Sequence, residues 1–137
     1  MANTIYPQGM KHFAFGDIVW KASGGSTIKT YLIDTADEAL NTADEFISDI
    51  TAAGIEETSG AMTLIDAASD GIVDANDVTF TGTAGDTCEA ILVAKDTGVG
   101  STSPLLFWWD SASGLPVTLG GDVTVAWDNG ANKIAKL

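Results

Sequence analysis

The chain has 137 residues, of which 45% are hydrophobic and only 18% are charged. This length and composition predict one folded domain and exclude a largely disordered protein. Six lysines, no arginine and 19 acidic residues give a formal net charge of -13, which repels nucleic acid and anionic membrane surfaces alike.

The first segment contains residues that disfavour a regular helix. Pro7 and Gly9 both interrupt helical structure, so we expect residues 1–12 to form an N-terminal arm. The remainder, residues 13–137, is predicted to be a single β-rich domain, because glycines separate many short apolar runs. No leader or membrane-spanning stretch is visible, and we expect synthesis in the cytoplasm.

Two strands and one short helix are predicted in the first half of the chain. Residues 13–21 carry apolar side chains on both parities, which is typical of a strand covered on both sides, and residues 28–34 predict a second strand. Thr42 and Glu45 then have the spacing of a capping box, which predicts a helix over residues 43–50. Residues 51–60 are expected to be a loop in which two adjacent glutamates are solvated (Glu56 and Glu57).

Short apolar runs separated by turn residues fill the second half. The run CEAILVAK, residues 88–95, is continuously apolar at its centre and predicts a core strand with both faces covered. Asn129-Gly130 is a strong hairpin signal. The resulting prediction is mainly β: an antiparallel β-sandwich or jelly-roll-like fold with one short helix. The other predicted strands are residues 62–66, 72–74, 78–80, 105–110, 123–127 and 133–137.

The side chains that usually carry chemistry are scarce. His12 is the one histidine, and we interpret it as a partly exposed structural residue rather than a general base. Cys88 is the one cysteine, and nearby acidic residues are expected to raise its pKa. We therefore predict no enzyme activity, no cofactor and no metal site. The acidic segment 70–77 lacks calcium-loop spacing and is interpreted as a turn, although cation binding there stays open.

Four tryptophans raise the alternative of a carbohydrate-binding module, because indole rings can serve as platforms for sugars. The simpler interpretation is that most of them fill the core. Trp108 and Trp109 are neighbours on a predicted strand, so they face opposite ways, and one of the two is expected to point outward as a contact anchor.

Several stretches resemble a family of small virion-associated structural proteins of tailed bacteriophages and prophages. They are IKTYLIDTAD (28–37), EFISDI (45–50), GIVDANDVTFTGTAGDTCEAILVAKDTG (71–98) and SGLPVTLGGDVTVAWDNGANKIAKL (113–137). The ending is the most specific part, with GLPVT, GGD and a β-run closing on WD-G-NKI in that order. The family begins with a more regular, basic helix, whereas Pro7, Gly9 and FAFGD predict none here.

The resemblance implies a particle component. We expect a capsid decoration or cement protein on the outer surface of the virion, bound to the major capsid protein or other virion proteins as a homotrimer or another homo-oligomer. The alternative within the particle is a tail, neck or fibre-attachment component. Contacts are expected from the N-terminal arm and an outward aromatic, which gives five candidate interface residues: Ile5, Tyr6, Met10, Trp108 and Trp109.

Overall fold

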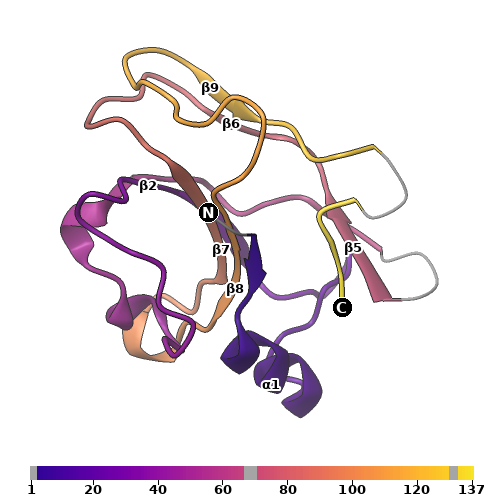
Figure 1. The fold of residues 1–137 in the computed structure, drawn as a ribbon. Helices are drawn as coiled ribbons and strands as arrows, with labels where there is room; N and C mark the ends of the chain where they lie inside the picture. Colours follow the sequence, from indigo (N-terminus) through magenta and orange to yellow (C-terminus); the bar gives the residue numbers. More distant parts are fainter. Residues whose placement is uncertain (1–2, 67–70, 130–132) are drawn as a thin grey trace.

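The computed structural model describes residues 3–66, 71–129 and 133–137. In this part of the chain the fold is mainly β, with ten strands in antiparallel sheets and one α-helix (Figure 1). The mainly β prediction is therefore confirmed. None of the described helices combines the length and the apolar character needed to cross a bilayer.

A five-stranded sheet organises the molecule. Its order is β1 (Thr4–Ile5), β8 (Leu105–Trp109), β7 (Ala90–Lys95), β2 (Ile28–Ile33) and β3 (Ile55–Thr58), and every neighbouring pair is antiparallel. β7 lies in the middle, as its continuous apolar sequence predicted, because only a strand covered on both faces can bury such a run.

The two faces of this sheet belong to two separate cores. Alternation along β2 sends Ile28 and Leu32 into the first core and Tyr31 and Ile33 into the second. All four side chains are buried. A strand whose two parities are both apolar therefore explains why the fold needs a covering layer on each side of the sheet.

Different kinds of structure cover the two faces (Figure 1). The first core is closed by a three-stranded sheet of β4 (Leu64–Ile65), β5 (Ile72–Ala75) and β10 (Ala135–Lys136), and by a ribbon of β6 (Val78–Phe80) and β9 (Val123–Val125). The second core is closed largely by the segment between β2 and β3, which contains short 3-10 turns: η1 (Ile47–Asp49) and η2 (Ala52–Gly54). A further turn, η4 (Gly100–Thr102), precedes β8.

The predicted N-terminal arm and the strand over residues 13–21 are wrong. Residues 4–5 form β1, and α1 (Pro7–Phe15) follows. Pro7 occupies the first helical turn, where a missing N–H costs nothing. Gly9 is required by packing, since a Cβ there would lie 2.3 Å from the Leu105 carbonyl oxygen. Gly16, with φ 81°, ends the helix in the left-handed conformation.

The predicted helix over residues 43–50 is also wrong, because only η1 forms there. Side-chain acceptors take the backbone N–H groups that a helix would use. The Asp49 carboxylate accepts hydrogen bonds from the N–H groups of Glu45 (3.0 Å) and Phe46 (2.9 Å), and the Asn41 side chain accepts one from Ala43 (3.1 Å). Phe46 is held extended by a β-bridge to Pro104.

Most strands of the second half lie where the sequence predicted them: β6 has the predicted bounds, β5 is one residue longer, and the others are shorter at one or both ends. β3 was missed, since residues 51–60 were expected to be a loop. The hairpin predicted at Asn129-Gly130 falls partly outside the described residues. β9 and β10, the strands on either side of it, pair with β6 and β5 and not with each other.

Candidate functional site

The five predicted interface residues have very different exposures. Tyr6 is fully buried, and its backbone N–H donates to the Leu106 carbonyl at 2.9 Å. Burial raises the pKa of its phenol, and Asp44 and Glu38 raise it further. Ile5 and Met10 are half-buried. Tyr6 is thus a core residue and cannot serve as the exposed contact that the sequence suggested.

The adjacent tryptophans do face opposite sides of the sheet, and they differ in exposure. Trp108 is 1% exposed and its indole N–H donates to Asp110 Oδ2 at 3.1 Å in the second core. Trp109 is half-buried against the first core, where its ring meets the Phe107 ring edge-on at 4.9 Å. Of the two, Trp109 is therefore the one that is partly exposed, and its role as a contact anchor stays a prediction.

Trp109 also lines a cavity. The cavity has a volume of about 420 Å³ and lies between the central sheet and β9, which is within the range of small-ligand pockets. Its lining is mostly apolar. The side chains that form it include Leu32 and Ile91 from the central sheet, and Trp109, Leu115, Val125, Trp127 and Ile134 around them.

Trp127, one of the residues that line this cavity, has an unsatisfied polar atom. Its side chain is 8% exposed, yet its indole N–H is buried and has no hydrogen-bond partner among the described residues. A buried donor without a partner costs about 1–3 kcal/mol relative to a satisfied one. The backbone N–H of Trp127 is satisfied, since it donates to Asp77 Oδ1 at 3.0 Å. Because the indole N–H is buried, it is not exposed to the cavity, whose lining is mostly apolar.

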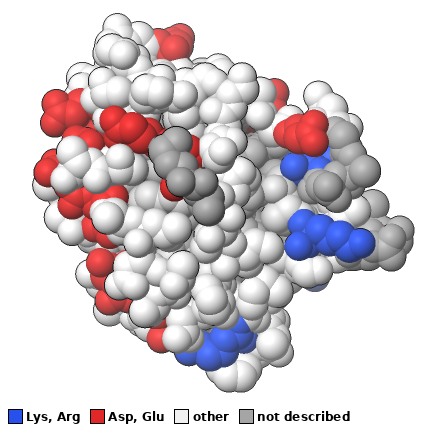
Figure 2. Space-filling view, viewed as in Figure 1, with Lys and Arg blue, Asp and Glu red and all other residues white. Residues whose placement is uncertain are grey.

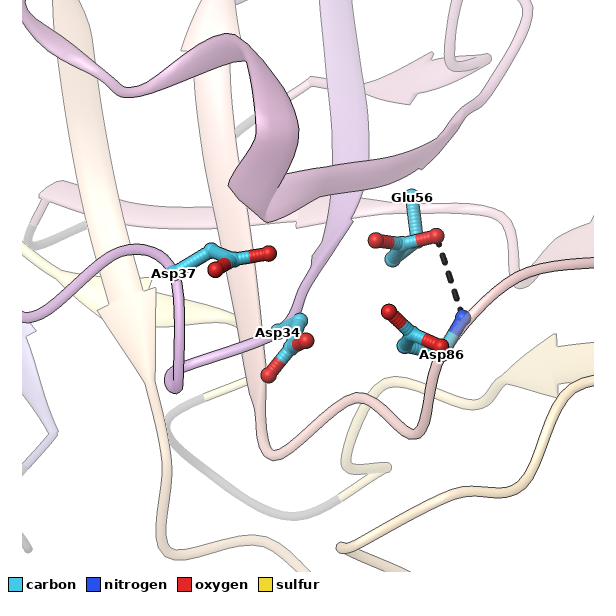
Figure 3. A group of neighbouring side chains, drawn as sticks. All are labelled: Asp34, Asp37, Glu56 and Asp86. Atoms are coloured by element: carbon cyan, nitrogen blue, oxygen red, sulfur yellow. Dashed lines mark hydrogen bonds between the residues drawn. The ribbon is translucent and has the colours of Figure 1, made fainter.

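A second candidate is a group of carboxylates that the sequence did not point to (Figure 3). Asp34, Asp37, Glu56 and Asp86 each place an oxygen within 4.8 Å of the others. They come from the end of β2, the turn after it, β3 and the loop before β7. Carboxylate oxygens are the type of ligand that hard cations such as Ca²⁺ prefer. These four residues, at positions 34, 37, 56 and 86, are widely spaced in the chain, so no local sequence motif could reveal the group.

Two of these carboxylates already have structural hydrogen bonds. Asp34 Oδ1 accepts from the Ala36 N–H at 2.8 Å, and Glu56 Oε2 accepts from the Asp86 N–H at 3.1 Å. Neighbouring Glu57 accepts from the Ala84 N–H at 3.0 Å. Glu56 and Glu57 are half-buried in β3 and accept backbone hydrogen bonds, a structural role that the sequence did not indicate. They attach the loop before β7 to β3.

The acidic segment 70–77, considered for calcium on sequence, is only partly described because Asp70 lies outside the described residues. Asp74 Oδ1 accepts from the Ala75 N–H at 2.9 Å, and Asp77 accepts from Trp127 as noted above. Both carboxylates thus hold backbone N–H groups. Asp74 lies in β5 (Ile72–Ala75), so the turn expected over residues 70–77 is limited to the connection between β5 and β6.

His12 and Cys88 are both held in place. The His12 ring nitrogens lie 2.8 Å from Asp17 Oδ2 and 2.8 Å from Glu45 Oε1, and the side chain is 12% exposed. Cys88 is 0% exposed. Its burial, followed by nearby Glu56 and Glu89, raises its pKa to about 12, in the direction that the acidic neighbours predicted.

Comparison with known proteins gives no further guide: no protein-family model matches the chain, and no curated protein matches it significantly.

Proposed function

We propose that this protein is a structural component of a tailed-phage virion, most specifically a decoration or cement protein that binds the outer surface of the major capsid lattice. The resemblance of residues 28–37, 45–50, 71–98 and 113–137 to virion-associated proteins supports the particle location. The strong negative charge supports a partner other than nucleic acid or an anionic membrane.

The observation that carries the proposal is the use of reactive groups for structure. A general base needs a free ring nitrogen and a nucleophilic thiol needs a lowered pKa. His12 instead has a carboxylate at each ring nitrogen, and Cys88 is buried with a raised pKa. The one histidine and the one cysteine therefore favour a protein that acts by binding over one that makes or breaks bonds.

The carboxylates support the same function, because many of them order loops. Glu38 accepts from the Thr51 N–H at 2.6 Å, Glu89 from the Thr35 N–H at 2.9 Å and Asp122 from the Gly82 N–H at 3.0 Å. Figure 2 shows acidic side chains gathered along the side of the molecule where the segment between β2 and β3 runs. Loops fixed in this way present a stable acidic surface, which a partner with a basic patch can recognise.

The test is co-sedimentation with phage particles from which accessory proteins have been removed. We expect the purified protein to bind at a saturating, lattice-defined ratio and to raise the temperature at which the particles release DNA, because many repeated weak contacts add through effective concentration. Failure to bind the shell, together with no gain in heat resistance, would remove the decoration proposal. Binding only to particles that carry tails would favour the tail, neck or fibre-attachment alternative.

A carbohydrate-binding module is the second candidate, and one observation favours it: Trp109 and Trp127 line the same cavity. Aromatic rings can stack on sugars. The mainly apolar remainder of the lining is less suited to hydroxyl groups. Saturable binding on a glycan array, lost in Trp109→Ala with folding intact, would support this candidate.

A further inference from the structure

The strand β9 presents an edge to the cavity. In the described residues β9 pairs with β6 alone, so its other edge has no strand partner. Residues 123–127 all line the cavity in unbroken succession. Because side chains alternate along a strand, five successive residues at one cavity place the backbone edge there as well as side chains. An edge of this kind can accept another extended chain.

The cavity next to this edge suits a bulky apolar side chain. Leu115 and Trp109 are half-buried at the cavity, while Leu32, Val125 and Trp127 are buried beneath. A strand added to β9 would present side chains alternately toward and away from this lining.

The charge around the edge indicates the kind of peptide. Asp122 immediately precedes β9, Asp128 lines the cavity, and the whole chain carries a net charge of -13. Lys133 is the one basic residue at the cavity among the described residues, and its ammonium donates to the Asn129 carbonyl at 3.3 Å. A segment that carries lysine or arginine beside its apolar anchor complements this surface.

We infer that the edge of β9 and the adjoining cavity dock an extended, basic segment of a partner protein, with one bulky apolar side chain inserted beside Trp109, Leu115 and Trp127. This deepens the proposed function and rests on it only for the identity of the partner as a virion protein. The docking mode is β-strand addition combined with one anchor pocket, a combination in which backbone bonds supply affinity and the pocket supplies specificity.

The first test uses three peptides and the isolated ¹⁵N-labelled protein. Acetyl-TKVFVKT-amide carries the anchor and the charge, acetyl-TKVAVKT-amide lacks the anchor, and acetyl-TEVFVET-amide reverses the charge. We expect the first peptide to shift the backbone amide resonances of residues 123–127 and the indole resonances of Trp109 and Trp127. The other two should bind at least about tenfold more weakly, because anchor residues dominate such interfaces.

A pair of variants, one at the cavity and one on α1, provides the control. Leu115→Glu places a charge at the half-buried cavity wall and should abolish the peptide-induced shifts. Phe15→Glu changes a side chain that is 70% exposed at the end of α1 and should leave them intact. No shift with any of the peptides at about 1 mM, the weak limit of specific binding, would overturn the inference. So would shifts confined to α1, or shifts produced instead by oligosaccharides.

The same variants separate this inference from the proposed function. Equal sedimentation of wild type and Leu115→Glu with stripped particles would show that the protein binds virions by another surface. Peptide binding without any sedimentation would leave the docking surface standing and remove the virion role.

Discussion

The two faces of the central sheet are covered in different ways, and the difference shows where order and openness come from in this fold. The first face is closed by strands that pack through apolar side chains, and a cavity of about 420 Å³ remains beneath β9. The second face is closed by an irregular segment that carboxylates hold through backbone N–H groups, as Glu38 does for Thr51. The first cover thus depends on apolar packing, and the second depends on polar contacts that fix loops.

The largest expected effect is a difference in stability between variants of the two adjacent tryptophans. Trp108→Ala empties a fully buried site in the second core and should lower the free energy of unfolding by about 3–5 kcal/mol. Trp109→Ala should cost less than half as much, because Trp109 is half-buried at the cavity. Urea unfolding followed by far-UV circular dichroism measures both values. Equal losses would mean that the two faces are packed alike.

A smaller effect is expected where a carboxylate holds the irregular cover. Glu38 is 7% exposed, and its Oε2 accepts from the Thr51 N–H at 2.6 Å. Glu38→Ala leaves that N–H without its acceptor and should cost about 1–3 kcal/mol. Glu38→Gln keeps an acceptor oxygen and is the matched control, with a smaller loss. If Ala and Gln variants unfold at the same urea concentration, the hydrogen bond is not what orders this segment.

The pH dependence of stability should divide between two aspartates of the same segment. N–H groups of Phe46 and Glu45 lower the pKa of Asp49, so its stabilising contribution is full above the unfolded value of about 3.9 and is lost as pH falls through the lower folded value. Burial, with Asp49 and Glu38 nearby, raises the pKa of Asp44. The contribution of Asp44 to stability therefore has the opposite sign: it favours the folded state in acid and is lost as pH rises through the raised pKa of the folded state.

Thermal unfolding from about pH 7 to pH 3 checks both directions. Asp49→Asn should lower the Tm near neutrality and reduce the loss of Tm on acidification. Asp44→Asn should raise the Tm near neutrality, since it removes the partly buried charge while keeping an acceptor for the Asn41 amide, which now donates to Asp44 Oδ1 at 2.8 Å. Parallel curves for wild type and both variants would contradict these directions.

The smallest effect on stability is expected in the group of four neighbouring carboxylates. Asp37 is exposed and places an oxygen within 4.8 Å of those of Asp34, Glu56 and Asp86. Asp37→Asn should therefore stabilise the protein slightly, by roughly 0.5 kcal/mol or less at low salt, and added salt should erase the gain. Lower stability of this variant would show that the carboxylate makes a favourable contact outweighing repulsion.

How far the sequence predicts this fold depends on whether the signal is local. β6, β7 and β8 follow from runs of apolar residues that stay together in the chain. α1 was missed because Gly9 was taken as a residue that interrupts a helix. Its presence is instead explained by its close approach to Leu105, which lies far away in sequence. β3, with the sequence IEET, was missed because its glutamates read as solvent-facing, whereas they accept N–H groups from residues 84 and 86.

The candidate sites show the same division. The parity of Trp108 and Trp109 was predictable from alternation, but their exposure was not, because it depends on what covers each face of the sheet. The cavity joins residue 32 to residue 134, and the carboxylate group joins residue 34 to residue 86. Neither arrangement has a local sequence signature, so both appear only when the sheets are assembled.

Cryo-electron microscopy of the intact phage particle tests the central claim most directly. We expect density for this chain at repeated positions on the outer surface of the capsid lattice, with the open edge of β9 against a neighbouring virion protein. Absence of the chain from purified virions, or density confined to the tail or neck, would contradict its assignment as a decoration protein.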